Sequence, residues 1–130
     1  MSEGDQTIFQ DDTPEQVCDA AISRLDDCLN EVLDRNKTEP DQVRNKTFVA
    51  MWGSDVTGEE LEADLDASYE NKPPMMRQVL HQAVLICCAY AIQGMKTYQA
   101  GEDLNLAWRY ATRCRFWEGI VQSMWSLREP

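Results

Sequence analysis

Apolar residues recur along this chain at steps of three and four, the spacing that places them on one side of an α-helix. The clearest case follows Thr13, where apolar residues repeat in this way as far as Leu33 while most acids fall outside the stripe. Thr13 is a good N-cap, and Pro14 suits the first helical position. The pattern therefore predicts an amphipathic helix over residues 13–35.

Four further helices are predicted from similar signals. A shorter pattern begins at Pro40 and ends before Gly53. The next begins after Thr57, where Glu60 three residues later completes a capping box. Two adjacent prolines then precede a segment that is apolar almost all round, as in a helix packed on most sides. The helices predicted from these patterns cover residues 40–52, 58–70, 74–99 and 102–127.

The fold class predicted from these elements is all-α. No segment alternates apolar and polar residues with β-branched side chains, and no Asn-Gly or Asp-Gly turn lies between apolar runs. The 130 residues are enough for one domain, so we expect a single-domain bundle of four to five helices with short links. Residues 1–12 lack periodicity and are expected to be a flexible N-terminal tail, which leaves 13–130 as the helical-bundle domain.

Charge divides the chain into two unlike halves. In total, 23 acidic and 12 basic side chains give a formal net charge of −11. Residues 1–70 hold 19 acids and 5 bases, a net charge of −14, whereas residues 71–130 hold 4 acids and 7 bases, a net charge of +3. The hydrophobic fraction of 43% is ordinary for a globular protein, so the charge does not imply disorder.

Nothing in the sequence suggests a membrane or secretion. No stretch approaches the ~20 apolar residues of a membrane span, and the N-terminal residues lack the basic and apolar regions of a secretory signal. A cytoplasmic location is therefore expected. The five cysteines form no Cys-x-x-Cys pair, so free thiols are the expected state. Cys87 and Cys88 lie in an apolar run and are interpreted as core residues rather than a redox pair.

Catalytic motifs are scarce. His81 is the only histidine, which excludes sites that need two, such as His-Glu-x-x-His zinc proteases and di-iron bundles. A hydrogen-bonded histidine at the edge of the core explains His81 better than a general base does. No Gly-rich phosphate loop and no Gly-x-Ser-x-Gly turn occurs. We therefore expect a protein that is not an enzyme and has no cofactor.

A metal-dependent enzyme is the minority alternative. Small all-α nucleotide pyrophosphohydrolases hold Mg²⁺ with carboxylates three residues apart on a helix. Here Glu31 with Asp34, and Glu59 with Glu62, have that spacing. The first pair points away from the apolar stripe of its helix, and so acidic a chain produces such pairs by chance. A solvated acidic face is the preferred explanation.

The last predicted helix mixes basic and aromatic residues. Arg109, Arg113 and Arg115 alternate with aromatic side chains, a composition known from proteins that bind nucleic acids by phosphate contacts and stacking. The net charge of −11 opposes such binding, so direct nucleic-acid binding is disfavoured. Ion pairs from Arg109 and Arg113 to the acidic edges of the first or third predicted helix are the preferred interpretation.

A different face of this helix suggests a subunit contact. On a helical wheel Trp108 lies opposite Tyr110 and Trp117, so the helix has a large aromatic residue on each side. Trp and Arg are enriched in interface hot spots. We expect Leu104, Trp108 and Arg115 to belong to the interface of a two-fold homodimer. A further helix of the same chain covering Trp108 is an equally good explanation.

The third predicted helix, residues 58–70, is the most acidic. Its apolar stripe consists of Leu61, Leu65 and Tyr69 alone, which is typical of a surface helix. It contains no base. We interpret its acids as a face that binds a basic protein partner. The six acids are Glu59, Glu60, Glu62, Asp64, Asp66 and Glu70.

The function that these features favour is a non-enzymatic acidic interaction module. Three versions fit equally: an inhibitor that occupies a nucleic-acid-binding surface, an immunity protein that neutralises a basic toxin, and an acidic secretion chaperone. All three rely on long-range electrostatic attraction to a basic surface. A structural subunit of a larger assembly, with the charge serving solubility, is a further alternative.

Overall fold

The computed structural model describes residues 12–25, 27–28 and 51–127. All the secondary-structure elements in these ranges are helical, so the predicted all-α class is confirmed for this part of the chain. The number of helices is consistent with the expected bundle. In chain order they are α2 (Pro14–Ser23), α5 (Gly58–Asn71), α6 (Met76–Ala100) and α7 (Leu104–Leu127).

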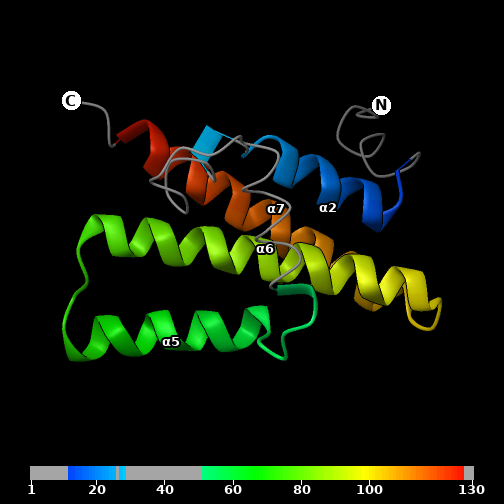
Figure 1. The fold of residues 1–130 in the computed structure, drawn as a ribbon, viewed down its shortest axis with the longest axis horizontal. Helices are drawn as coiled ribbons and strands as arrows, with labels where there is room; N and C mark the ends of the chain where they lie inside the picture. Colours follow the sequence, from blue (N-terminus) through cyan, green and yellow to red (C-terminus); the bar gives the residue numbers. More distant parts are fainter. Residues whose placement is uncertain (1–11, 26, 29–50, 128–130) are drawn as a thin grey trace, which may run out of the picture.

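α6 occupies the middle of the fold. It packs against α2, α5 and α7, and α2 also packs against α7. Figure 1 shows α5 on one side of α6 and α2 on the other, with α7 crossing behind α6. By length and composition α6 could cross a membrane, but 67% of its apolar window is buried inside the bundle. Its apolar character is therefore accounted for by its position as the core helix.

Small residues bring α6 and α7 close together. The buried residues of α7 include Ala107, Ala111 and Cys114. Gly94 of α6 lies beside Ala107, and the two helices pack against each other. A Cβ atom at Gly94 would lie 2.8 Å from Cys18 Sγ and 3.6 Å from the Ala107 carbonyl oxygen. A side chain at position 94 would therefore overlap Cys18 of α2, whereas its distance to α7 would be an ordinary contact.

All five cysteines are free and buried, as predicted for core residues. Cys87 Sγ lies 3.4 Å from the carbonyl oxygen of Cys114 and 3.8 Å from its Sγ. Burial raises the pKa of the Cys88 thiol to about 12. A thiol with such a pKa carries little thiolate at neutral pH, so these cysteines act as packing residues.

The predicted helix starts are confirmed where local capping defines them. Thr13 Oγ1 accepts a 3.1 Å hydrogen bond from the Gln16 amide, and Gln16 Oε1 accepts a 2.8 Å bond from the Thr13 amide. Thr57 and Glu60 form the same capping box at the start of α5. At the end of α6, Gly101 takes a positive φ of 71°, a left-handed conformation that glycine adopts without strain.

The first predicted helix, over residues 13–35, is interrupted in the structure. α2 ends at Ser23, and residues 24–25 form a turn before helical residues at 27–28. The Leu25 amide donates to the Ile22 carbonyl at 2.9 Å, a bond to the third residue back that ends the α-helical ladder. Residues 26 and 29–35 lie outside the described residues.

The other predicted boundaries need smaller corrections. Of the predicted helix 40–52, the structure describes only residues 51–52, which are helical and end at a turn at Gly53. α6 begins two residues later than predicted, because Met75 after the prolines is still extended. α7 also begins two residues later, since Asp103 Oδ1 accepts the Leu106 amide at 2.9 Å and serves as its N-cap.

Candidate acidic interaction site

The acidic helix α5 is fixed at its first turn by contacts to α6. The ring of Tyr90 covers Gly58, where a Cβ atom would lie 2.7 Å from three ring atoms. The Gly58 amide donates a 2.8 Å hydrogen bond to Gln93 Oε1. Glu59 and Glu60 lie in the same turn, where the helix dipole favours negative charge. The start of α5 therefore has a defined position on α6.

The remainder of α5 rests on α6 through a narrow apolar seam, as the sequence predicts. Leu65 is buried and Leu61 is half-buried, whereas Tyr69 at the end of the stripe is exposed. Gln82 Nε2 donates a 3.1 Å hydrogen bond to the Leu61 carbonyl oxygen. So little apolar contact leaves most of the helix surface in water.

The acids of the predicted partner-binding face divide into two groups. Five of the six are exposed: Glu59, Glu60, Asp64, Asp66 and Glu70. Glu60 caps the helix, and Glu59 accepts a 3.4 Å hydrogen bond from Gln93. The other three, at positions 64, 66 and 70, form no hydrogen bond or ion pair with a described residue. Glu62, the sixth acid, is half-buried and turns inward.

Glu62 ties α5 to α7. Its Oε2 accepts hydrogen bonds from Arg113 Nη2 and from Trp117 Nε1. The Arg113 guanidinium also lies over the rings of Tyr90 and Phe116, with its Cζ 5.7 Å and 4.8 Å from their centroids. The predicted ion pairing between the arginines of the last helix and the third helix is thus confirmed for Arg113.

This cluster shifts the pKa of its members in opposite directions. Partial burial alone would raise the pKa of Glu62, but the donors Arg113 and Trp117 and the nearby Tyr90 hydroxyl outweigh it, and its pKa lies below the ordinary value of 4.5. Burial, together with the Glu62 carboxylate, raises the pKa of Tyr90 to about 12. Glu62 is therefore a carboxylate and Tyr90 a neutral donor at neutral pH.

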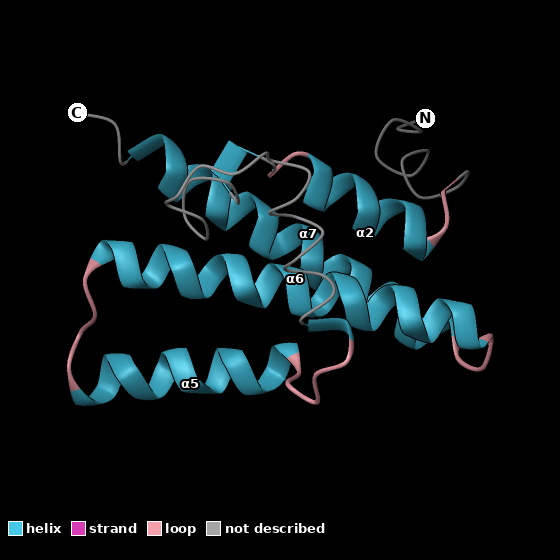
Figure 2. Ribbon diagram, in the orientation of Figure 1, coloured by secondary structure: helices cyan, strands magenta, loops and turns pink. Residues whose placement is uncertain are grey.

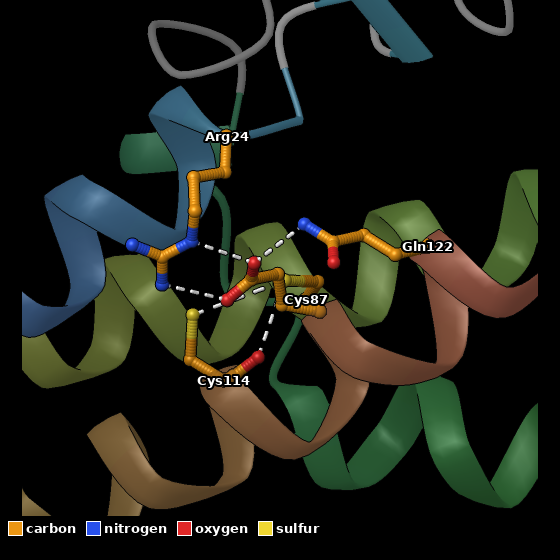
Figure 3. Close-up of polar contacts among 5 residues, drawn as sticks. Arg24, Cys87, Cys114 and Gln122 are labelled. Atoms are coloured by element: carbon orange, nitrogen blue, oxygen red, sulfur yellow. Dashed lines mark hydrogen bonds and ion pairs between the residues drawn. The ribbon is translucent and has the colours of Figure 1, made fainter. Parts of the chain in front are cut away.

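A second ion pair ties α2 to α7. Arg24 donates to both carboxylate oxygens of Glu118, Nε at 2.8 Å and Nη2 at 2.9 Å, and Gln122 Nε2 donates at 2.8 Å (Figure 3). Glu118 is 6% exposed. The burial of Glu118 was not predicted from the sequence. Its position indicates it, because Glu118 lies four residues after Cys114 and three before Val121, on the core spacing of α7.

The alternative magnesium site is not assembled among the described residues. Glu31 and Asp34 lie outside them, Glu59 is exposed beside Gln93, and Glu62 is occupied by Arg113 and Trp117. In the described part of the chain, no group of three or more His, Cys, Asp or Glu side chains could hold a metal ion.

The residues predicted for a homodimer interface differ in exposure. Leu104 is exposed at the first turn of α7, whereas Trp108 and Arg115 are half-buried. Trp108 packs against the buried core of its own chain. The homodimer stays a prediction, and Leu104 is the member of the set that a partner would reach most easily. His81 is exposed on α6.

Comparisons with protein-family models, with curated protein sequences and with solved structures found no match.

Proposed function

We propose that the chain is a non-enzymatic interaction module in which the exposed acids of α5 bind a basic protein surface. The observation that carries this proposal is that one acid of α5 is bound inside the molecule while the others are exposed. Glu62 fastens the helix to α7, while Asp64, Asp66 and Glu70 extend into water and have no partner among the described residues. Exposed carboxylates on a fastened helix form a preorganised binding surface.

The geometry of the helix supports this proposal further. Glu59, Asp66 and Glu70 follow one another at steps of seven and four residues, which places them on one side of α5. At 1.5 Å per residue they form a row about 17 Å long. α5 contains no base, so its side chains offer no internal cation to neutralise the row.

A basic protein surface fits this row better than other partners do. Nucleic acids are repelled by carboxylates, and the repulsion acts over a Debye length of about 10 Å at 0.1 M salt. A basic surface is attracted over the same distance, which raises its association rate. Surfaces that bind nucleic acids are basic. Inhibition of such a protein is therefore the version of this function that we favour, and an immunity protein or a secretion chaperone would use the same contacts.

A binding assay with a lysine-rich peptide as the probe tests the proposal. Fluorescence anisotropy would measure the dissociation constant from about 0.01 M to about 0.15 M salt, where the Debye length falls from about 30 Å to about 8 Å. The triple variant Asp64→Asn, Asp66→Asn, Glu70→Gln should bind roughly tenfold more weakly at low salt, since exposed charge pairs contribute ~0.2–1 kcal/mol each.

The matched control neutralises three exposed acids elsewhere: Asp19→Asn, Asp27→Asn and Glu102→Gln. Both triple variants have a net charge of −8 instead of −11, so any effect of total charge is the same in each. The proposal requires that only the α5 variant loses most of the binding. An equal loss of peptide affinity in the two variants would contradict the proposal. So would an affinity that does not change with the salt concentration.

A further inference from the structure

Tyr69 is the aromatic residue of α5, and it is exposed among the acids of that helix. It continues the apolar stripe of Leu61 and Leu65, yet 49% of its surface is accessible. Within the described part of the chain, its ring contacts no other ring and no cation, and its hydroxyl forms no hydrogen bond. Tyrosine is enriched at interface hot spots. The ring of Tyr69 is therefore available to a partner.

Tyr69 lies beside the row of exposed acids. Residues three apart on a helix are neighbours, so the Cβ atoms of Asp66 and Tyr69 are about 5–6 Å apart. Glu70, the next residue of the row, directly follows Tyr69. Lys72 is the base that follows α5, and it is exposed and forms no ion pair with a described residue. The ring and the two carboxylates are thus open to the same cation.

The same side of α5 already holds an arginine of this chain two turns earlier. Glu62, Asp66 and Tyr69 follow one another at steps of four and three residues, which places them along one side of the helix. At Glu62, the Arg113 guanidinium donates to the carboxylate and lies over the ring of Tyr90, 5.7 Å from its centroid. At Asp66 and Tyr69, a carboxylate and a ring occur together again, but no arginine of the described residues contacts them.

We propose that Tyr69 makes the acidic face selective for arginine over lysine in its basic partner. A planar guanidinium donates two parallel hydrogen bonds to a carboxylate such as that of Asp66, while its face lies against the Tyr69 ring. A lysine ammonium is a compact, strongly hydrated charge that pairs with the carboxylate and covers less of the ring. The inference rests on the proposed function and adds to it the kind of basic segment that binds, one rich in arginine.

The experiment compares two peptides that differ only in carrying arginine or lysine at every basic position. Fluorescence anisotropy at about 0.01 M salt measures the dissociation constant of each peptide. The wild-type protein should bind the arginine peptide roughly two- to fivefold more tightly, the gain expected for one exposed contact between a cation and an aromatic ring. Since the carboxylates attract both peptides, the ratio of the two dissociation constants measures the choice between the bases.

Two substitutions of Tyr69 separate its ring from its other properties. Tyr69→Leu removes the ring but keeps an apolar side chain that is favourable in a helix, and it should lose most of the preference for arginine. Tyr69→Phe is the matched control, because it keeps the ring and should keep the preference. Both variants retain the net charge of −11, so the affinity for the lysine peptide should be unchanged in each.

The possible results separate this inference from the proposed function. Equal affinity of the wild type for the two peptides overturns the selectivity while the acidic face stands. A preference that Tyr69→Leu retains in full does the same, since the carboxylates alone would then account for it. Loss of the preference in Tyr69→Phe would overturn the contact with the ring. If neither peptide binds at about 0.01 M salt, the proposed function fails, and the selectivity that rests on it fails too.

Discussion

Glu62 differs from the other acids of α5 because its carboxylate is used inside the molecule. It is 22% exposed and accepts two hydrogen bonds from α7, one of them from the Arg113 guanidinium. Hydrogen bonds to charged groups contribute more than neutral ones, about 1.5–3 kcal/mol when well shielded. Arg113 is 42% exposed, so water weakens the pair and its contribution is smaller, about 1–2 kcal/mol.

The variant Glu62→Gln should therefore lower the free energy of unfolding by about 1–2 kcal/mol at pH 7. The amide keeps an acceptor for Trp117 but loses the charge that attracts Arg113. Since folding lowers the pKa of Glu62, its charge contributes fully above the ordinary pKa of 4.5, and this contribution disappears as the pH falls through the lower folded pKa. Urea unfolding at a series of pH values measures both effects.

Asp66→Asn is the control for this measurement, since it removes one carboxylate from the exposed side of the same helix. Its free energy of unfolding should stay within about 0.5 kcal/mol of the wild type. The difference between wild type and Glu62→Gln should shrink in acid. A difference that stays constant down to a pH well below 4.5 would show that the charge of Glu62 plays no part.

At the scale of the element, α5 depends on a close approach at its first residue. Tyr90 lies flat enough against Gly58 that any side chain there would overlap its ring, and Tyr90 itself is buried. The position of α5 on α6 therefore requires glycine at 58, for reasons of space rather than of backbone conformation.

Gly58→Ala should destabilise the protein by about 1–2 kcal/mol. The overlap of the new methyl group with the Tyr90 ring costs more free energy than the higher helix propensity of alanine contributes. Gly119→Ala is the matched substitution, as no atom lies within 4 Å of its ideal Cβ position. It should stabilise the protein by roughly 0.5–1 kcal/mol. Thermal unfolding of the two variants checks the pair. A loss of stability in both would mean that the contact with Tyr90 is not the cause.

Local signals explain which elements the sequence predicts well. The capping boxes at Thr13 and Thr57, the proline link and Gly101 involve residues close together in the chain, so their patterns are visible without the fold. The break after α2 has no such marker, since Arg24 is a good helix former and its partner Glu118 is 94 residues away.

Tertiary contacts also explain why the acidic face was predicted only in part. All six acids of α5 look alike in the sequence, and five are exposed as a solvated face requires. Glu62 turns inward because Arg113 and Trp117 of α7 happen to lie beside it. The spacing of Glu62 within α5 carries no information about α7, so its role could not be read from that helix alone.

At the scale of the whole molecule, the exposed acids of α5 and the core shared by α2, α6 and α7 occupy different parts of the fold. α5 and α2 lie on opposite sides of α6, and α7 crosses behind it, as Figure 2 shows. The exposed acids of the proposed interaction site belong to α5, and α2, α6 and α7 supply most of the core. Cys18, Cys87 and Cys114 belong to that core, one from each of the three packed helices. The thiols therefore report on the opening of α2, α6 and α7, and α5 can loosen without exposing them.

The rates at which the thiols react with a disulfide reagent should separate these two kinds of opening. Buried thiols react through the open state, so the rate follows the free energy of opening. Arg24→Met removes both hydrogen bonds that join α2 to Glu118 and should accelerate the reaction of Cys18 roughly tenfold. Glu62→Gln should accelerate that reaction much less, because the contact it weakens joins α5 to α7 and leaves the contacts of α2 in place. If both variants accelerate Cys18 equally, α5 and the core open together, and the acidic helix is not a separately fastened surface.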